Sequence, residues 1–144
     1  MKKLPPIEKV FEAWTALAGN RVRLHESYAD VSSSDGEKAY VVKFSGDQYS
    51  SDDNATFWQG YAGYPVIAVM MLQHKLPFDP EEASLWKDIN WTKLNKRHKN
   101  DYSAAVAEVA DERGIDLSKA YEEAQKVMEA LSSAPIEIKR KIKS

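Results

Sequence analysis

The chain has 144 residues, a net charge of -2, 43% hydrophobic residues and 29% charged residues. A chain of this length usually forms one domain with a core of its own, and the composition is ordinary for a globular protein. Because the pI is near 5.9, the chain is not basic overall, and binding to nucleic acid or acidic lipid would need a local patch. The lack of cysteine excludes disulfides, thiolate catalysis and cysteine-ligated metal sites.

The N-terminal segment does not have the pattern of a secretory signal. Lys2 and Lys3 are followed by a leucine and a proline pair rather than by an apolar stretch. The most apolar run, residues 62–72, is shorter than the roughly 20 residues that span a bilayer. We therefore expect a cytoplasmic protein that does not enter a membrane.

Residues 6–18 are predicted to form the first helix. The apolar residues that recur there at helical spacing are Ile7, Val10, Phe11, Trp14 and Leu17. The Gly-Asn pair that follows tolerates the left-handed conformation in which many helices end.

Two strand-like segments, residues 21–31 and 39–45, flank a hairpin signal at Asp35-Gly36. A two-residue turn there pairs Val42 with Ala29 and puts the apolar residues of the two segments on opposite faces. A slip or bulge of one residue reverses the face of every side chain. We predict the slipped register, because it brings the two apolar faces together.

The middle of the chain is predicted to contain a loop, a strand and a buried helix. Residues 46–54 are polar and rich in turn formers, whereas aromatic residues in 55–61 favour a third strand. Pro65 suits the first turn of a helix, and uncharged apolar side chains follow it as far as Leu72. Because these side chains cover every side of the helix, we predict that it lies at the centre of the fold.

The second half of the chain is predicted to be helical, with a capping residue before each helix. These caps are Asp79, Asn90, the pair Asn100-Asp101, and Asp116. The tail, residues 135–144, alternates isoleucine with positive charges and fits an edge strand, a frayed helix or a disordered segment. We expect one domain over residues 1–134, followed by this basic tail.

The expected fold class is therefore α+β in a single domain. It has an N-terminal helix and a small antiparallel β-hairpin or three-stranded sheet, which packs on the central buried helix. The C-terminal half is helical.

No residue pattern predicts catalytic residues, a metal site or a cofactor. The three histidines are not spaced as zinc ligands, and no nucleophile motif or calcium loop is present. The middle of the chain is instead rich in aromatic residues, which serve interfaces as well as cores. The leading hypothesis is a non-enzymatic binding or interaction module that could bind a protein partner or a second copy of itself. Its candidate ligand or partner surface consists of Tyr49, Trp58, Tyr61 and Tyr64.

A second hypothesis assigns nucleic-acid binding to a local basic patch. The patch consists of Lys93, Lys96, Arg97 and Lys99, joined by the basic tail from Lys139 to Lys143. A solvated helix face explains the same charges and is favoured, because the chain lacks an overall basic character.

A third hypothesis is a small enzyme with a pocket under the loop from Asp47 to Tyr64. His25, Asp52 or Asp53 would act there as acid or base, provided that they converge on one pocket. The glycine-rich residues 60–65 could hold an anion at the start of the central helix. The favoured alternative is structural: these glycines let the chain turn into a crowded core.

Overall fold

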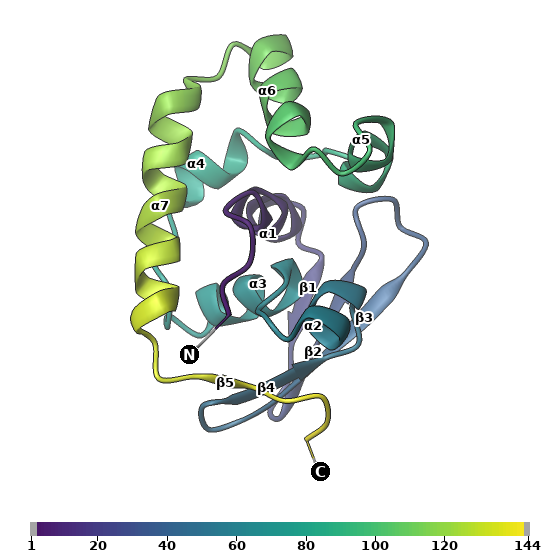
Figure 1. Ribbon diagram of the computed structural model, residues 1–144, viewed down its shortest axis with the longest axis vertical. Coiled ribbons are helices and arrows are strands. Elements are labelled where there is room, and N and C mark those ends of the chain that lie inside the picture. The colour runs from purple at the N-terminus through teal and green to yellow at the C-terminus, as the bar shows by residue number, and fades with distance from the viewer. Residues whose placement is uncertain (1–2, 143–144) are drawn as a thin grey trace.

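The computed structural model describes residues 3–142 and has an α+β fold in which a sheet and several helices enclose a central helix (Figure 1). The helices are α1 (Lys9–Ala18), α2 (Asn54–Gln59), α3 (Tyr64–Leu72), α4 (Pro80–Ser84), α5 (Trp91–Arg97), α6 (Tyr102–Arg113) and α7 (Leu117–Ser133). The strands are β1 (Val22–Leu24), β2 (Tyr28–Ser32), β3 (Ala39–Ser45), β4 (Gln48–Ser51) and β5 (Glu137–Ile138). They form one five-stranded sheet in the order β1-β2-β3-β4-β5, antiparallel except where β5 pairs with β4. The expected fold class is confirmed, with a larger sheet than the sequence predicts.

Helix α3 lies at the centre of the fold, as predicted. Every residue from Val66 to Met71 is at most 2% exposed. The helix packs against α1 and against strands β1, β3 and β4. Because its apolar side chains point in all directions, burial on every side stabilises it. Pro65 occupies the first turn, where its missing N–H is not needed.

Helix α1 buries its apolar face against α3 and against helices of the second half. Val10, Phe11 and Trp14 are at most 1% exposed, and both α4 and α7 pack on α1. The regular helix begins three residues later than predicted, because a tighter turn precedes it. The Lys9 N–H donates to the Pro6 carbonyl at 3.0 Å, which is an i to i+3 bond.

The hairpin of β2 and β3 has the register of the two-residue turn, so the predicted slip is wrong. Ala29 pairs with Val42, and Val31 pairs with Tyr40. Ala29, Val31 and Val42 have no exposed surface. The buried face of the hairpin is therefore apolar without any slip.

The register of this hairpin was predicted wrongly because residues 21–31 do not form one continuous strand. The chain reverses after β1, and Val22 pairs with Val31 of β2. The His25 N–H donates to the Tyr28 carbonyl at 2.8 Å within this reversal. As a result Val31 is buried whereas Tyr28 is exposed. The turn between β1 and β2 thus puts the apolar residues of both strands on one face of the sheet. The prediction explained this match of apolar faces by a slip in the hairpin of β2 and β3 instead.

Two segments before α3 also differ from the prediction. Residues 46–54, predicted as a loop, contain β4, whose Tyr49 is fully buried. Residues 55–61, predicted as a strand, instead form most of α2. Asp53 caps this helix by accepting a hydrogen bond from the Thr56 N–H at 3.0 Å. The capping interaction outweighs the preference of the aromatic residues for a strand.

The capping residues predicted for the second half are confirmed. Asp79, Asn90, Asp101 and Asp116 each accept a hydrogen bond from a backbone N–H in the first turn of α4, α5, α6 and α7, respectively. Each helix of this half thus begins where a local side chain satisfies its free N–H groups.

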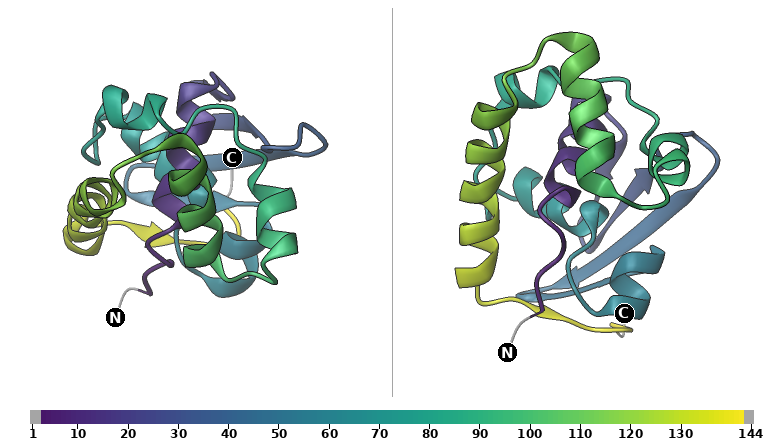
Figure 2. Two further views of the ribbon diagram at one scale, coloured as in Figure 1. Left: turned by 90° about the horizontal axis from the view of Figure 1, so that it is seen from above. Right: turned by 45° about the horizontal axis from the view of Figure 1, so that its top comes forward.

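Of the three states left open for the tail, β5 is an edge strand. The Lys139 N–H donates to the Tyr49 carbonyl at 2.7 Å. The chain then runs past α2 (Figures 1 and 2). The Arg140 guanidinium lies 5.3 Å from the centroid of the Phe57 ring. Lys143 lies outside the described residues. The start of the basic tail is therefore attached to the sheet beside α2.

Candidate functional site

Two adjoining hollows form a groove between α1, α2, α5 and α6, which we call the central groove. Their volumes are about 440 Å³ and 420 Å³, sizes that are typical of ligand sites. Lys9, Asn54, Ala55 and Tyr102 line both hollows, so the two share one surface. In Figure 1, α5 lies above α1 and α2 lies below it. The groove therefore combines residues that are far apart in the sequence.

A buried ion pair forms the floor of the central groove. Lys9 Nζ lies 3.1 Å from Glu12 Oε2, and the two side chains are 10% and 9% exposed. Burial raises the pKa of Glu12, although Lys9 opposes this change. Burial alone would lower the pKa of Lys9, but Glu12 and Tyr102 outweigh it and raise this pKa. Lys9 is therefore held as a cation beneath the groove.

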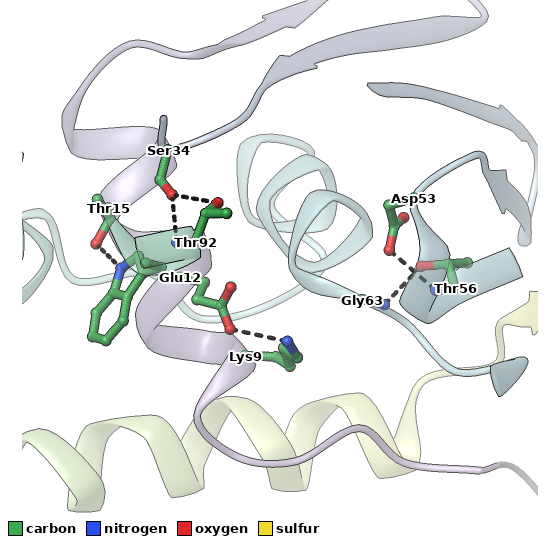
Figure 3. A network of polar contacts seen from close by, with 9 residues as sticks. Lys9, Glu12, Thr15, Ser34, Asp53, Thr56, Gly63 and Thr92 are labelled. Atoms are coloured by element: carbon green, nitrogen blue, oxygen red, sulfur yellow. Dashed lines mark hydrogen bonds and ion pairs between the residues drawn. The ribbon is translucent and has the colours of Figure 1, made fainter. Parts of the chain in front are cut away.

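The side of the groove formed by α5 is fixed by hydrogen bonds to other elements. Trp91 Nε1 donates to Thr15 Oγ1 at 2.8 Å, which connects α5 to α1. The Thr92 N–H donates to Ser34 Oγ at 3.2 Å, which connects α5 to the loop between β2 and β3. Figure 3 shows the ion pair between these bonds and a second polar group around Asp53.

The side formed by α2 is organised by Asp53, which is 5% exposed. Its Oδ2 accepts the capping bond from the Thr56 N–H, and its Oδ1 accepts a bond from the Ser51 hydroxyl. Thr56 Oγ1 in turn accepts a hydrogen bond from the Gly63 N–H at 2.9 Å (Figure 3). Because this N–H is already bonded inside the protein, Gly63 supports the structural interpretation of the glycine-rich segment rather than an anion site.

Aromatic rings supply much of the remaining groove surface. Tyr40 and Tyr64 meet edge to face, with ring centroids 6.3 Å apart. Burial raises the pKa of Tyr64, so its hydroxyl stays protonated. Lys9 Nζ lies 4.3 Å from the centroid of the Tyr102 ring. Trp58, which lines the second hollow, is 65% exposed.

Positive charges stand at both ends of the central groove. Lys96 and Lys99 line the first hollow and are exposed. Beside the second hollow, Lys3 Nζ and the Arg140 guanidinium lie 5.6 Å and 5.5 Å from the centroids of the Tyr61 and Trp58 rings, respectively. The carboxylates that line the groove are buried and bonded within the protein. Among the charged residues that line the groove, those exposed to solvent are therefore positive.

Three of the four residues predicted as a ligand or partner surface line the central groove. Tyr64 lines the first hollow, and Trp58 and Tyr61 line the second. Tyr49 has no exposed surface, and its hydroxyl donates to Gln73 Oε1 at 2.6 Å. Tyr49 therefore belongs to the core.

The predicted basic patch is divided in the structure. Lys96 and Lys99 line the central groove. Arg97 forms an ion pair with Glu108 of α6, and Lys93 is exposed outside the groove lining. Only half of the patch therefore faces the groove.

The three candidate acid/base residues are not brought together. His25 lies on the surface of the sheet, where its Nε2 is 2.8 Å from Asp30 Oδ2. Asp52 accepts a hydrogen bond from the Val41 N–H at 2.8 Å and lines a different hollow. Asp53 lines the central groove. The geometric condition for the predicted enzyme pocket is not met by these residues.

Sequence reasoning missed Lys9, Glu12, Tyr40 and Tyr102 as groove residues. The one available signal was the spacing of Lys9 and Glu12, because opposite charges three residues apart meet on a helix. That spacing predicts an ion pair but does not predict its burial. Tyr40 and Tyr102 reach the groove only through the tertiary fold.

Within residues 3–142, no cluster of three or more histidine, aspartate or glutamate side chains is arranged to hold a metal ion. No helix in this described part of the chain is long and apolar enough to cross a membrane. No curated protein and no solved structure matches the chain. A family comparison matches residues 2–137, which is nearly the full length, and the chain therefore belongs to the family described as uncharacterised conserved protein UCP014422.

Proposed function

We propose that this protein is a non-enzymatic binding module whose ligand lies in the central groove. The observation that carries the proposal is the Lys9–Glu12 ion pair, which is buried in the floor of a groove with aromatic walls. Removing two charges from water is costly, and hydrophobic residues of similar volume often give equal or greater stability. A buried ion pair under an open groove is thus better explained by recognition than by stability.

The side chains around the ion pair are suited to binding. Aromatic rings offer large, rigid contact surfaces, and Asn54 and Asn100 add amide groups that donate and accept hydrogen bonds. The groove therefore offers both stacking surfaces and hydrogen-bonding groups to a ligand.

Binding is favoured over catalysis because the groove carboxylates already have partners. Glu12 pairs with Lys9, and Asp53 caps α2 while accepting a second bond from Ser51. A general acid or base must be within hydrogen-bond reach of the substrate and free to exchange a proton with it. In the structure Glu12 and Asp53 serve as an ion-pair partner and as a helix cap, and these roles favour binding over proton transfer.

The test compares a groove-filling variant with a matched control. Ala55 lines both hollows, so Ala55→Trp fills the groove, whereas Ala107 is exposed on α6 and lines neither hollow. Thermal unfolding is measured with a panel of sugars, amino acids, peptides, nucleotides and organic acids. A ligand at saturating concentration should raise the Tm of the wild type and of Ala107→Trp by about 5 °C or more.

The same ligand should leave the Tm of Ala55→Trp unchanged. If no compound raises the Tm of the wild type, or if every effective compound also stabilises Ala55→Trp, the central groove is not the binding site.

A further inference from the structure

We infer that the ligand of the central groove is a nucleotide, free or within a single-stranded nucleic acid. The shared chemistry is an aromatic base joined to a phosphate. This inference rests on the proposed function and names its ligand class. It is carried by the charge and the aromatic character of one continuous surface.

The first step is the distribution of charge. Lys96 and Lys99 are exposed at one hollow, and Lys3 and Arg140 lie beside the other. The carboxylates of the groove are buried and compensated within the protein, so they do not cancel these cations at the surface. Cations at both ends of a groove suit a ligand with spaced negative charges, such as a phosphate backbone.

The second step is the position of the aromatic rings between these cations. Trp58 and Tyr61 line the second hollow, and Tyr102 lines both. Trp58 remains 65% exposed although Arg140 lies over its ring. An exposed ring in a positively charged groove is the arrangement on which bases of single strands stack. A neutral sugar would use the rings but would gain little from the lysines.

The third step is the supply of hydrogen-bonding groups between the rings and the cations. Asn54 lines both hollows and Asn100 lines the first. Gln59 lines the second hollow, where its Oε1 accepts a hydrogen bond from Lys3 Nζ at 3.0 Å and its amide N–H groups remain for a ligand. Amide side chains donate and accept at once, and this matches the mixed edges of unpaired bases. An acidic peptide offers negative charge but no planar edge for these amides.

The experiment measures the fluorescence anisotropy of a labelled single-stranded oligonucleotide of about 12 nucleotides, a length within the usual site sizes. We expect binding that Trp58→Ala weakens by about 5- to 150-fold, the range for loss of one stacked base. Trp58→Phe should retain most of the affinity, because its ring still stacks. An unchanged affinity in Trp58→Ala would overturn the inference.

Salt dependence tests the lysines separately. Replacing Lys96 and Lys99 by glutamine should reduce the slope of log affinity against log salt by about 1.4. The control replaces Lys87 and Lys119, which are exposed outside the groove lining, and should leave the slope unchanged. Equal slopes for the two double variants would contradict the inference.

Competition identifies the source of the ligand chemistry. If a mononucleotide such as AMP displaces the labelled strand, the ligand is a free nucleotide. If only unlabelled single strands displace it, the ligand is a single-stranded nucleic acid. Equal displacement by poly-glutamate or by duplex DNA would overturn the inference, since neither presents free bases. If a compound of another class binds and Ala55→Trp abolishes its binding while no nucleotide binds, the binding module stands and only the nucleotide inference fails.

Discussion

Gly63 occupies a position where limited space, rather than backbone conformation, selects glycine. Its N–H donates to Thr56 Oγ1, and this bond holds the start of α3 against α2. A Cβ at this position would lie 2.5 Å from Asp53 Oδ2 and 2.7 Å from Thr56 Oγ1. Both neighbours are buried and hydrogen-bonded, so they cannot move away without loss.

Gly63→Ala should therefore destabilise the protein by about 3 kcal/mol, as expected for overpacking at a rigid site. Gly60→Ala is the control, because Gly60 has a φ of 74° and no atom within 4 Å of the added Cβ. Its expected cost is about 1 kcal/mol from the left-handed conformation alone. Urea denaturation measures both, and a smaller loss in Gly63→Ala than in Gly60→Ala would contradict the close approach.

The Lys9–Glu12 pair gives a second prediction for single residues. Lys9→Met or Glu12→Gln alone leaves one buried charge without its partner, and each should cost about 3 kcal/mol in the free energy of unfolding. The double variant removes both charges and should recover most of this loss. A double-mutant cycle at neutral pH measures the coupling. Additive losses would show that the two charges do not depend on each other.

Helix α3 connects the sheet to the helices of the second half. Ile67 has no exposed surface, and Ile67→Ala should cost about 2–5 kcal/mol because it leaves a cavity. Leu85 is 46% exposed, and the control Leu85→Ala should cost less than about 1 kcal/mol. Chemical denaturation of the two variants measures the difference. Similar losses would mean that α3 is not enclosed.

Elements whose signals are local could be predicted from the sequence. The caps at Asp79, Asn90, Asp101 and Asp116 act within one helical turn, so the sequence contains all that determines them. The sheet depends on the reversal between β1 and β2, which carries no glycine or proline signal. Taking these strands as one segment led directly to the wrong register.

Helix α2 was missed because two local signals conflict. Phe57 and Trp58 favour a strand, whereas Asp53 offers a cap to the N–H of Thr56. The bond from Gly63 to Thr56 adds a tertiary contact that only the helix can make. The candidate groove was out of reach for a similar reason, because Lys9, Tyr102 and the cations around them meet only in the folded chain.

The molecule as a unit should lose stability at alkaline pH through its partly buried tyrosines, of which Tyr64 and Tyr121 have the largest pKa shifts. Burial raises the pKa of Tyr64 and of Tyr121 above the ordinary value of 10.0, and the hydrogen bond from the Tyr121 hydroxyl to Glu8 adds to the second shift. Above pH 10 these phenols ionise in the unfolded chain before they ionise in the folded protein, so the free energy of unfolding falls as pH rises.

Urea denaturation between pH 8 and about 11 measures this dependence. Tyr64→Phe and Tyr121→Phe should each make the decline less steep than in the wild type. If both variants have the pH profile of the wild type, the assignment is contradicted.

A further hollow of the described surface lies outside the central groove. It measures about 630 Å³ and lies between the end of α3 and the start of α4, where His74 and Phe78 line it. It contains neither a buried ion pair nor a cluster of aromatic rings with cations on both sides. Its lining therefore lacks the features that make the central groove the candidate site.

Amide NMR of the protein, titrated with a short single-stranded oligonucleotide, separates these two surfaces in one measurement. We predict that the shifted resonances cluster at Lys9, Ala55, Tyr61, Lys96 and Tyr102, all in the central groove. Shifts centred on His74 and Phe78, or no shifts at saturating concentration, would contradict nucleotide binding in the central groove.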